Sequence, residues 1–301
     1  MRGTLASPGG GCLLRIPWLR EVMVMVRYAR LLERGEEFLE RWGLRQEGTP
    51  MSGRVSVVLP VVLGDGTRAA LKLQDVDDET VGEGLALRTW GGDGVVRLLD
   101  EDAETGTLLL ERLDEGRPLD TVPDVMKATG ILAELLARLT AVPAPEGLRR
   151  LDGVVAEMFE RLPAVLKSLE GEGGDEDDRR LLKDCAAAVR EVADEPGDRL
   201  LHWDLHFENV LAAEREPWLV IDPKPLAGDP GFELLPALWN RYDEGRLARR
   251  FDLMTETLGL DRERARAWTL GRVLQNSLWQ VEEGEGLDAE QVGIARVLLG
   301  R

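Results

Sequence analysis

The chain has 301 residues, of which 44% are hydrophobic and 31% are charged, and its formal net charge is −18. This length suffices for two domains or two lobes with a sizeable core. Because a nucleic-acid surface is normally a basic patch, the acidic balance argues against nucleic-acid binding.

The N-terminal segment shows no pattern of export or membrane insertion. Arg15, Arg20 and Arg27 interrupt its apolar pieces before a membrane-spanning length accumulates. We therefore predict neither a signal peptide nor a membrane span. The start of the chain up to about Gly11 is expected to be a flexible leader, and an amphipathic helix is predicted over residues 31–42.

The next part of the chain predicts a small β-rich half. The strands "RVSVVLPVVL" (54–63) and "RAALKLQ" (68–74) are joined by "GDG" (64–66), which favours a tight turn. A third strand is predicted in "TLLLERL" (107–113). Before that strand, the acidic opening of "DDETVGEGLALRTW" (77–90) indicates the start of a helix.

The later part of the chain changes to long helices. Apolar stripes at helical spacing run through "ILAELLARL" (131–139) and "VVAEMFERL" (154–162), and again around Trp268. Cys185 lies on a similar stripe. Because Cys12 and Cys185 are too few and too far apart for a disulfide framework, Cys185 is expected to be a thiol in the core.

One β interlude interrupts the helical half, and it holds both histidines of the chain. "RLLHWD" (199–204) and "PWLVID" (217–222) are predicted strands that each end in a carboxylate, and the segment between them can pair back as a hairpin. The strand ends would bring Asp204 and Asp222 together, and Asn209 adds a neutral oxygen ligand. Hard oxygen ligands of this kind suit Mg²⁺ bound together with substrate phosphates.

The spacing of these residues resembles a known catalytic loop. The order His202-x-Asp204-x4-Asn209, followed by Asp222, is similar to the catalytic loop and metal-binding aspartate of the protein-kinase-like superfamily. The resemblance requires a strand lysine upstream, and Lys72 stands between apolar residues on the second predicted strand. It implies that Lys72 contacts the α- and β-phosphates of the nucleotide.

The resemblance also assigns parts of the β-rich half. Glu83 is expected to pair with Lys72, with Glu79 as the alternative, because both glutamates follow the lysine on the predicted helix. Glu111 and Leu113 would belong to the hinge between the lobes, where backbone groups can pair with adenine. The nucleotide is expected between the lobes. In place of the glycine-rich loop of protein kinases, the chain offers a single glycine at the tip of a turn.

Four segments together resemble the aminoglycoside/hydroxyurea antibiotic resistance kinase family, in its streptomycin 6-phosphotransferase branch. They are "GDGTRAALKL", "LLLERL", "HWDLHFENVL" and "VIDPKPLAGDPGFELLPALWN", and the resemblance extends from about Gly48 to Trp279. It implies an α+β, two-lobed protein-kinase-like fold. We therefore predict an N-terminal leader, a helix and a small antiparallel β-sheet lobe that binds the nucleotide over residues 1–112. A mainly helical catalytic and substrate lobe is predicted over residues 113–301.

The resemblance implies an ATP-dependent small-molecule kinase. Asp204 would accept the proton of the acceptor hydroxyl, and Asn209 and Asp222 would bind Mg²⁺ on the phosphates. His202 would brace the loop through the backbone, while His206 would either face the γ-phosphate or brace the loop as well. The need for ATP and the lack of an export signal predict a cytoplasmic enzyme.

The acceptor implied by the resemblance is a hydroxyl-bearing small molecule such as streptomycin or hydroxyurea. Acidic residues would attract a cationic acceptor, and Glu208, Asp229 and Glu233 are close to the loop in sequence. Asp229 and Glu233 could equally cap and brace a helix. No oligomeric state is predicted.

Two alternatives stay open from the residues alone. On a continuous strand, His202, Asp204 and His206 would point to one face, as in a metal-dependent hydrolase with a zinc or two-metal site. Zinc sites usually take at least three protein ligands with supporting partners, and the chain has no further histidine. The second alternative is a catalytically silent kinase-like protein that binds a ligand or partner.

Overall fold

The computed structural model describes residues 17–53, 55–170 and 176–301. The predicted leader up to about Gly11 and the thiol of Cys12 lie outside the described residues. Within the described part of the chain, no helix is both long and apolar enough to cross a membrane.

The described chain forms two compact units. Unit 1 holds residues 17–76 and 99–112, and unit 2 holds residues 77–98 and 113–301. The junction predicted after residue 112 coincides with one of the junctions between the units, whereas residues 77–98 group with unit 2. The division into domains over residues 1–112 and 113–301 stays a prediction.

Unit 1 is one helix on an antiparallel sheet. Its elements are α1 (Pro17–Arg41), β1 (Arg45–Gln46), β2 (Met51–Ser52), β3 (Ser56–Val62), β4 (Arg68–Gln74), β5 (Leu98–Asp102) and β6 (Thr107–Glu111). The strand order is β1-β3-β4-β6-β5, and β2 also pairs with β3. The strands predicted around the "GDG" turn are confirmed as β3 and β4.

The turn between β3 and β4 closes as its sequence predicted. Gly66 has a φ of +88°, a conformation that glycine adopts without steric cost. Leu63 N donates to Thr67 O over 2.9 Å, and Asp65 Oδ1 accepts from Thr67 N over 2.9 Å. These bonds fix the register in which Lys72 lies opposite Val58.

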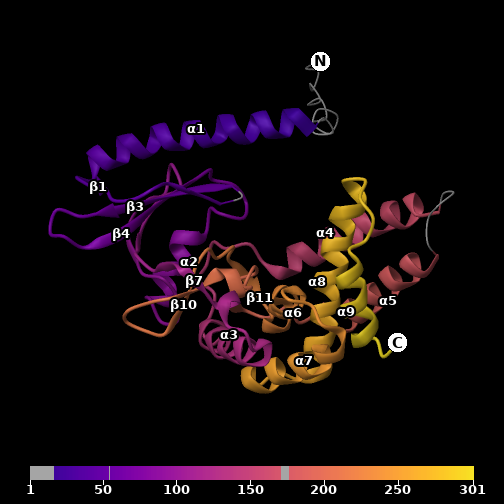
Figure 1. The fold of residues 1–301 in the computed structure, drawn as a ribbon. Helices are drawn as coiled ribbons and strands as arrows, with labels where there is room; N and C mark the ends of the chain where they lie inside the picture. The colour runs from indigo at the N-terminus through magenta and orange to yellow at the C-terminus, as the bar shows by residue number, and fades with distance from the viewer. Residues whose placement is uncertain (1–16, 54, 171–175) are drawn as a thin grey trace, which may run out of the picture. The chain divides into compact units, whose positions relative to one another are not determined.

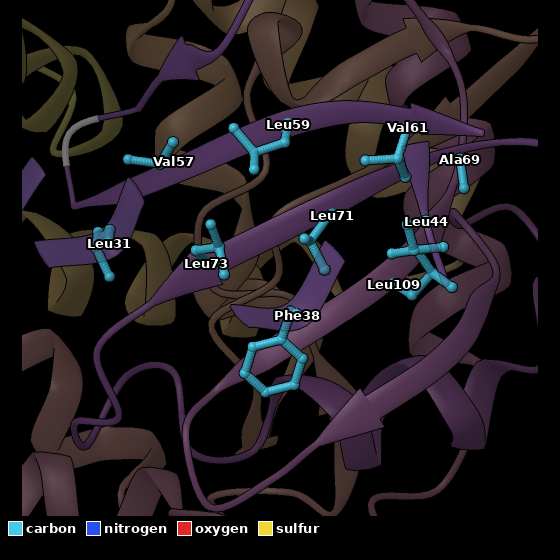
Figure 2. Packing of buried hydrophobic residues seen from close by; sticks show 10 residues of the cluster. All are labelled: Leu31, Phe38, Leu44, Val57, Leu59, Val61, Ala69, Leu71, Leu73 and Leu109. Carbon is cyan, nitrogen blue, oxygen red and sulfur yellow. The ribbon is translucent and has the colours of Figure 1, made fainter. Parts of the chain in front are cut away.

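Helix α1 supplies the apolar cover of the sheet in unit 1. Figure 2 shows its buried side chains Leu31 and Phe38 against apolar residues of the strands, among them Leu59 and Leu73. A Cβ at Gly35 would lie 2.8 Å from Leu59 Cδ1 and 2.9 Å from Leu73 Cδ1. The missing side chain therefore lets the helix approach β3 and β4 closely.

The helix starts earlier than the predicted residues 31–42. Pro17 suits the first turn of a helix because it has no N–H to leave unpaired. The first half of α1 then carries exposed apolar side chains at Val24, Met25 and Val26, which are 58%, 70% and 64% exposed. No regular division into a polar and an apolar face marks this half, so the sequence pattern did not reveal it.

Unit 2 combines a short helix with three small β pairings and a set of long helices (Figure 1). Its helices of eight residues or more are α2 (Glu83–Trp90), α3 (Val125–Thr140), α4 (Leu151–Ser168), α5 (Glu176–Val192), α7 (Glu244–Leu258), α8 (Arg262–Glu282) and α9 (Ala289–Leu298). The shorter elements are β7 (Asp114–Pro118), η2 (Leu119–Thr121), β8 (Arg199–Leu201), η3 (Phe207–Asn209), β9 (Val210–Ala212), β10 (Trp218–Val220), β11 (Leu226–Gly228), η4 (Pro230–Glu233) and α6 (Leu234–Trp239).

The apolar stripes of the helical half are buried as predicted. Helix α8 packs against α4, α5 and α9, and Trp268 and Leu274 on it are fully buried. Cys185 on α5 is buried and free, and burial raises its pKa to about 12. The thiol therefore behaves as a core side chain, as the sequence predicted.

Specific contacts explain why residues 77–98 group with unit 2. Trp90 Nε1 at the end of α2 donates to Leu139 O of α3 over 3.1 Å. Val96 N donates to Val220 O over 2.8 Å, so the chain after α2 lies beside β10.

Shortening one α1 side chain should destabilise unit 1. Phe38 is 3% exposed, and its ring lies edge-on to Trp42 with ring centres 4.7 Å apart. A Phe38→Ala change should cost about 3–5 kcal/mol of unfolding free energy through lost burial and an unfilled cavity. Denaturant unfolding of Phe38→Ala beside the exposed control Glu36→Ala would measure it. Equal midpoints for the two variants would contradict the packing of α1 on the sheet.

Candidate active site

The loop with both histidines lies between short strands of unit 2. Strand β8 pairs antiparallel with β11, and β9 pairs antiparallel with β10. The loop therefore leaves β8, passes through η3 and enters β9, while Asp222 follows β10. The hairpin of β9 and β10 confirms the sequence prediction, and the partner strand β11 is an element that the prediction missed.

Backbone hydrogen bonds tie this loop to the segment that carries Asp222. Ile221 N donates to Asn209 O over 2.9 Å, and Lys224 N donates to His202 O over 2.9 Å. The main chain around Asp222 is therefore held beside both ends of the loop.

His202 is fully buried and braces the loop as a neutral ring. Its Nδ1 accepts a hydrogen bond from Asp204 N over 3.2 Å, so Nε2 carries the proton that is donated to Ile221 O over 2.8 Å. Burial lowers the pKa of His202 to about 4, although the Ile221 carbonyl favours the charged form. This is the bracing role that the resemblance implied.

Trp203 turns the chain just before the predicted base. Its φ is +67°, and this left-handed conformation costs a non-glycine residue on the order of 1 kcal/mol. Glu233 Oε1 accepts from Trp203 N over 2.9 Å. The guanidinium carbons of Arg149 and Arg272 lie 4.6 Å and 4.9 Å from the centre of the indole ring. These contacts hold the turn in place.

Asp204 presents a carboxylate whose side chain is 29% exposed. Its Oδ2 lies 3.1 Å from Lys224 Nζ, and the same ammonium lies 3.4 Å from Glu79 Oε2. Burial is the largest influence on the pKa of Lys224 and lowers it, but the nearby charges of Asp204 and Glu79 outweigh burial, so the pKa is raised. Lys224 is therefore a cation beside the predicted base.

Asn209 and Asp222 offer oxygen atoms that could bind a divalent cation. Asn209 Nδ2 donates to Asp204 O over 2.9 Å, which leaves the amide oxygen as the atom available for a ligand. Asp222 has a φ of +59° and is linked to Asn209 through the backbone bond of its neighbour Ile221. One carboxylate and one amide oxygen form a donor set that suits Mg²⁺ with phosphate and water ligands.

The other acidic candidates are bound within the protein. Asp229 Oδ1 accepts from Gly231 N over 2.8 Å, and Asp229 Oδ2 accepts from Arg264 Nε over 2.7 Å. Glu233 is fully buried, and burial raises its pKa to about 7. The structure therefore gives Asp229 and Glu233 capping and bracing contacts, the alternative to acceptor attraction that the sequence left open.

His206 lies at the start of η3 with its side chain 28% exposed. Its Nδ1 lies 2.7 Å from Glu208 Oε2, and the Glu208 side chain is 58% exposed. The contact of His206 with the γ-phosphate stays a prediction.

The predicted residues of the β-rich half are divided between the units. Lys72 lies in β4 of unit 1, is 4% exposed and has Val58 and Leu108 as strand neighbours. Glu83 begins α2 in unit 2 and is 1% exposed. The Lys72–Glu83 pair stays a prediction. Glu79, the alternative partner, lies in unit 2 and contacts Lys224.

The two predicted hinge residues follow each other closely along the chain. Glu111 is the last residue of β6, and Leu113 is 8% exposed directly before β7. Both lie where unit 1 passes into unit 2 along the chain. Their contact with adenine stays a prediction.

The metal-hydrolase alternative is contradicted by the geometry of the loop. Strand β8 ends at Leu201, so His202, Asp204 and His206 do not share one face of a continuous strand. Both ring nitrogens of His202 contact backbone groups. Among the described residues, no group of three or more His, Cys, Asp and Glu side chains is placed to hold a metal ion.

The contacts of Glu233 and Arg272 with Trp203 were not predicted from the sequence, although Glu233 was expected either to attract the acceptor or to brace a helix. The two residues lie 30 and 69 positions further along the chain than Trp203, and no local pattern indicates such contacts. Lys224 was not predicted as a site residue. Its place in the sequence, two residues after Asp222, is the signal that could have linked it to the site.

The neutral state of His202 can be measured directly because the chain has only two histidines. In His206→Gln protein with ¹³C-labelled histidine, the single ring should titrate near pH 4, below the ordinary value of 6.5. The depressed pKa implies a contribution to folding stability that is complete above pH 6.5 and is lost as the pH falls toward 4. A midpoint near 6.5 in the folded protein would contradict the buried brace.

Sequence comparison identifies relatives over most of the chain. Residues 41–284 match the family model described as aminoglycoside/hydroxyurea antibiotic resistance kinase. The chain is 62% identical to a hydroxyurea phosphotransferase of Kitasatospora aureofaciens over 268 residues, which is 88% of this chain and 78% of the relative. It is 55% identical to a streptomycin 6-kinase of Streptomyces glaucescens, with 88% of each chain covered.

Solved structures confirm the predicted fold class. A thermostable mutant of the aminoglycoside phosphotransferase APH(4)-Ia, in a ternary complex with ADP and hygromycin B, matches with a TM-score of 0.59. The match covers 88% of this chain and 97% of the other at 17% identity, which supports the α+β kinase-like fold alone. The named kinases among its sequence relatives, at 62% and 55% identity, show that the protein is a small-molecule kinase, as predicted. The chain belongs to the aminoglycoside/hydroxyurea antibiotic resistance kinase family.

Proposed function

We propose that this kinase transfers the γ-phosphate of ATP to a hydroxyl group of an aminoglycoside such as streptomycin, or of hydroxyurea. The observation that carries the proposal is the partly exposed carboxylate of Asp204, fixed beside Lys224 and joined through its carbonyl to the amide of Asn209. The names of the relatives at 62% and 55% identity support these two acceptor classes.

In the proposed reaction, Asp204 acts as the general base. The acceptor oxygen forms a bond to the γ-phosphorus while its proton passes to Asp204. The bond between the γ-phosphorus and the bridging oxygen breaks, and ADP leaves with that electron pair. Because such transfers depend mainly on positioning and charge neutralisation, a carboxylate that orients the hydroxyl is sufficient.

We assign metal binding to Asn209 and Asp222. Their oxygen donors suit Mg²⁺, and the backbone bond from Ile221 to Asn209 keeps their chain segments together. When bound, Mg²⁺ would neutralise charge on the nucleotide phosphates. The residues of the chain contribute the orientation, since Asn209 is fixed by its own hydrogen bond to Asp204.

Further contacts with the nucleotide are proposed from family likeness. Lys72 would contact the α- and β-phosphates with Glu83 as its ion-pair partner, and His206 would face the γ-phosphate. Glu111 and Leu113 would offer backbone groups to adenine. The low exposure of Lys72, 4%, supports a fixed rather than a freely solvated ammonium. The use of ATP supports a cytoplasmic location.

Both acceptor classes are chemically compatible with this base. Hydroxyurea offers an N-hydroxyl group, and aminoglycosides offer sugar hydroxyls together with positive charge. The net charge of −18 favours the approach of a cation to the protein as a whole. The family likeness, rather than the charge, supports hydroxyurea.

Removing the base should abolish most transfer to either acceptor. Asp204→Asn should lower kcat by roughly 10²- to 10⁴-fold, because the variant can orient the hydroxyl but cannot take its proton. A coupled assay of ADP formation with hydroxyurea and with streptomycin would measure it. Asp198→Asn, at an aspartate whose side chain is 80% exposed, is the matched control. Full activity of Asp204→Asn would rule out the proposed base, and an inactive wild type with both acceptors would rule out the acceptor classes.

Changing the metal ligand should give a different kinetic result. Asp222→Asn removes a charged oxygen donor and should raise the Mg²⁺ concentration for half-maximal rate by at least about tenfold. Titration of Mg²⁺ at fixed ATP distinguishes this weaker use of Mg²⁺ from the loss of kcat in Asp204→Asn. The Mg²⁺ concentration for half-maximal rate should stay near the wild-type value in Asp204→Asn. An unchanged Mg²⁺ requirement in Asp222→Asn would contradict the metal assignment.

A further inference from the structure

Lys224 lies between two carboxylates at the candidate site. Its Nζ is 3.1 Å from Asp204 Oδ2 and 3.4 Å from Glu79 Oε2. The side chains of Lys224, Asp204 and Glu79 are 31%, 29% and 46% exposed, so the group is reachable from solvent but partly shielded. One ammonium therefore contacts two carboxylates that are far apart in the sequence.

The backbone around Lys224 is fixed by its neighbours. Lys224 N donates to His202 O over 2.9 Å, and proline residues stand directly before and after the lysine. Because each proline ring restricts its own backbone and that of the residue before it, this short segment has few alternative conformations. The side chain of Lys224 thus extends from a backbone position that is fixed beside the catalytic loop.

The segment that carries Glu79 is also held close to Lys224. A Cβ at Gly82 would lie 2.9 Å from Pro225 Cγ and 2.6 Å from Leu148 Cδ2. Only glycine permits this approach without displacement of a neighbour. The chain after Glu79 therefore packs directly on the residue that follows Lys224.

The other cations near the loop have different contacts. Arg149 and Arg272 lie against the ring of Trp203, and Arg272 also donates to Gln275 Oε1 over 2.5 Å. Among the described residues, Lys224 is the cation with an ion pair to Asp204. Arg272 also attracts Asp204 electrostatically, but Lys224 is in direct contact with it and can therefore reduce repulsion between this carboxylate and incoming phosphate oxygens.

We propose that Lys224 is a positioning residue for phosphoryl transfer. Its ammonium holds Asp204 Oδ2, so that Oδ1 is the oxygen that faces the acceptor hydroxyl, and Glu79 holds the ammonium in place. When Asp204 takes the acceptor's proton and loses its charge, Glu79 still balances the charge of Lys224. This inference rests on the proposed role of Asp204 as the base and extends it to two further residues.

Substitutions at Lys224 separate positioning from simple structural support. Lys224→Met keeps a similar length without charge and should lower kcat on the order of 10²-fold, with little change in KM for ATP. Lys224→Arg keeps the charge and should recover part of kcat. Lys183→Met, at an exposed lysine of α5, is the matched control and should leave both constants unchanged.

Glu79 provides the second arm of the test. Glu79→Gln should lower kcat less than Lys224→Met does. In the Lys224→Met background it should lower kcat no further, because Glu79 acts only by holding the Lys224 ammonium beside Asp204. A wild-type kcat in Lys224→Met would overturn the proposal. So would a loss confined to KM, or a Glu79→Gln effect that is equally large in both backgrounds.

A measurement without an acceptor distinguishes this inference from the proposed function. Denaturant midpoints of Lys224→Met, Asp204→Asn and the double variant should be non-additive, with the double variant losing less than the sum. If the wild type phosphorylates neither acceptor, the acceptor assignment fails. The role of Lys224 is then decided by the double-mutant cycle of denaturant midpoints together with the rate of ATP hydrolysis. Additive midpoints and an unchanged hydrolysis rate in Lys224→Met would overturn it.

Discussion

The candidate site depends on the buried imidazole of His202. Its two nitrogens join the amide of Asp204 to the carbonyl of Ile221, so one neutral ring links the loop to the strand end before Asp222. The ring can do this only as an uncharged tautomer, because the acceptor nitrogen would otherwise carry a proton. Complete burial enforces that state. The placement of the predicted base relative to the segment predicted to bind metal therefore depends on desolvation of the His202 side chain, which braces the loop.

Local charge at the site differs from the charge of the whole chain. The protein carries a net charge of −18, yet Arg149, Arg272 and Lys224 gather around Trp203 and Asp204. Phosphate chemistry needs cations where the anions meet, while the surface elsewhere can remain acidic. A prediction from net charge alone describes long-range attraction and says little about the reacting groups.

The sequence predicted those features that arise from neighbours along the chain, and missed those that depend on distant contacts. The "GDG" turn, the hairpin of β9 and β10 and the contiguous loop of His202, Asp204 and Asn209 each depend on local spacing. By contrast, the turn that follows β8 is held at Trp203 by residues from far along the chain. Within the first half of α1, the consecutive residues Val24, Met25 and Val26 are all apolar and exposed, so this stretch lacks the periodicity on which a helix prediction rests.

At Trp203 the backbone and the side chain favour different residues: the left-handed backbone favours glycine, whereas the contacts with two arginines require an aromatic ring. Glycine would relieve the backbone of its steric cost, but it would also leave Arg149 and Arg272 without the aromatic face on which they stack. An ordinary aliphatic side chain would satisfy neither demand. Tryptophan is thus favoured before the predicted base for its ring in spite of its backbone conformation. The unfavourable conformation persists because two guanidinium groups stack on that ring.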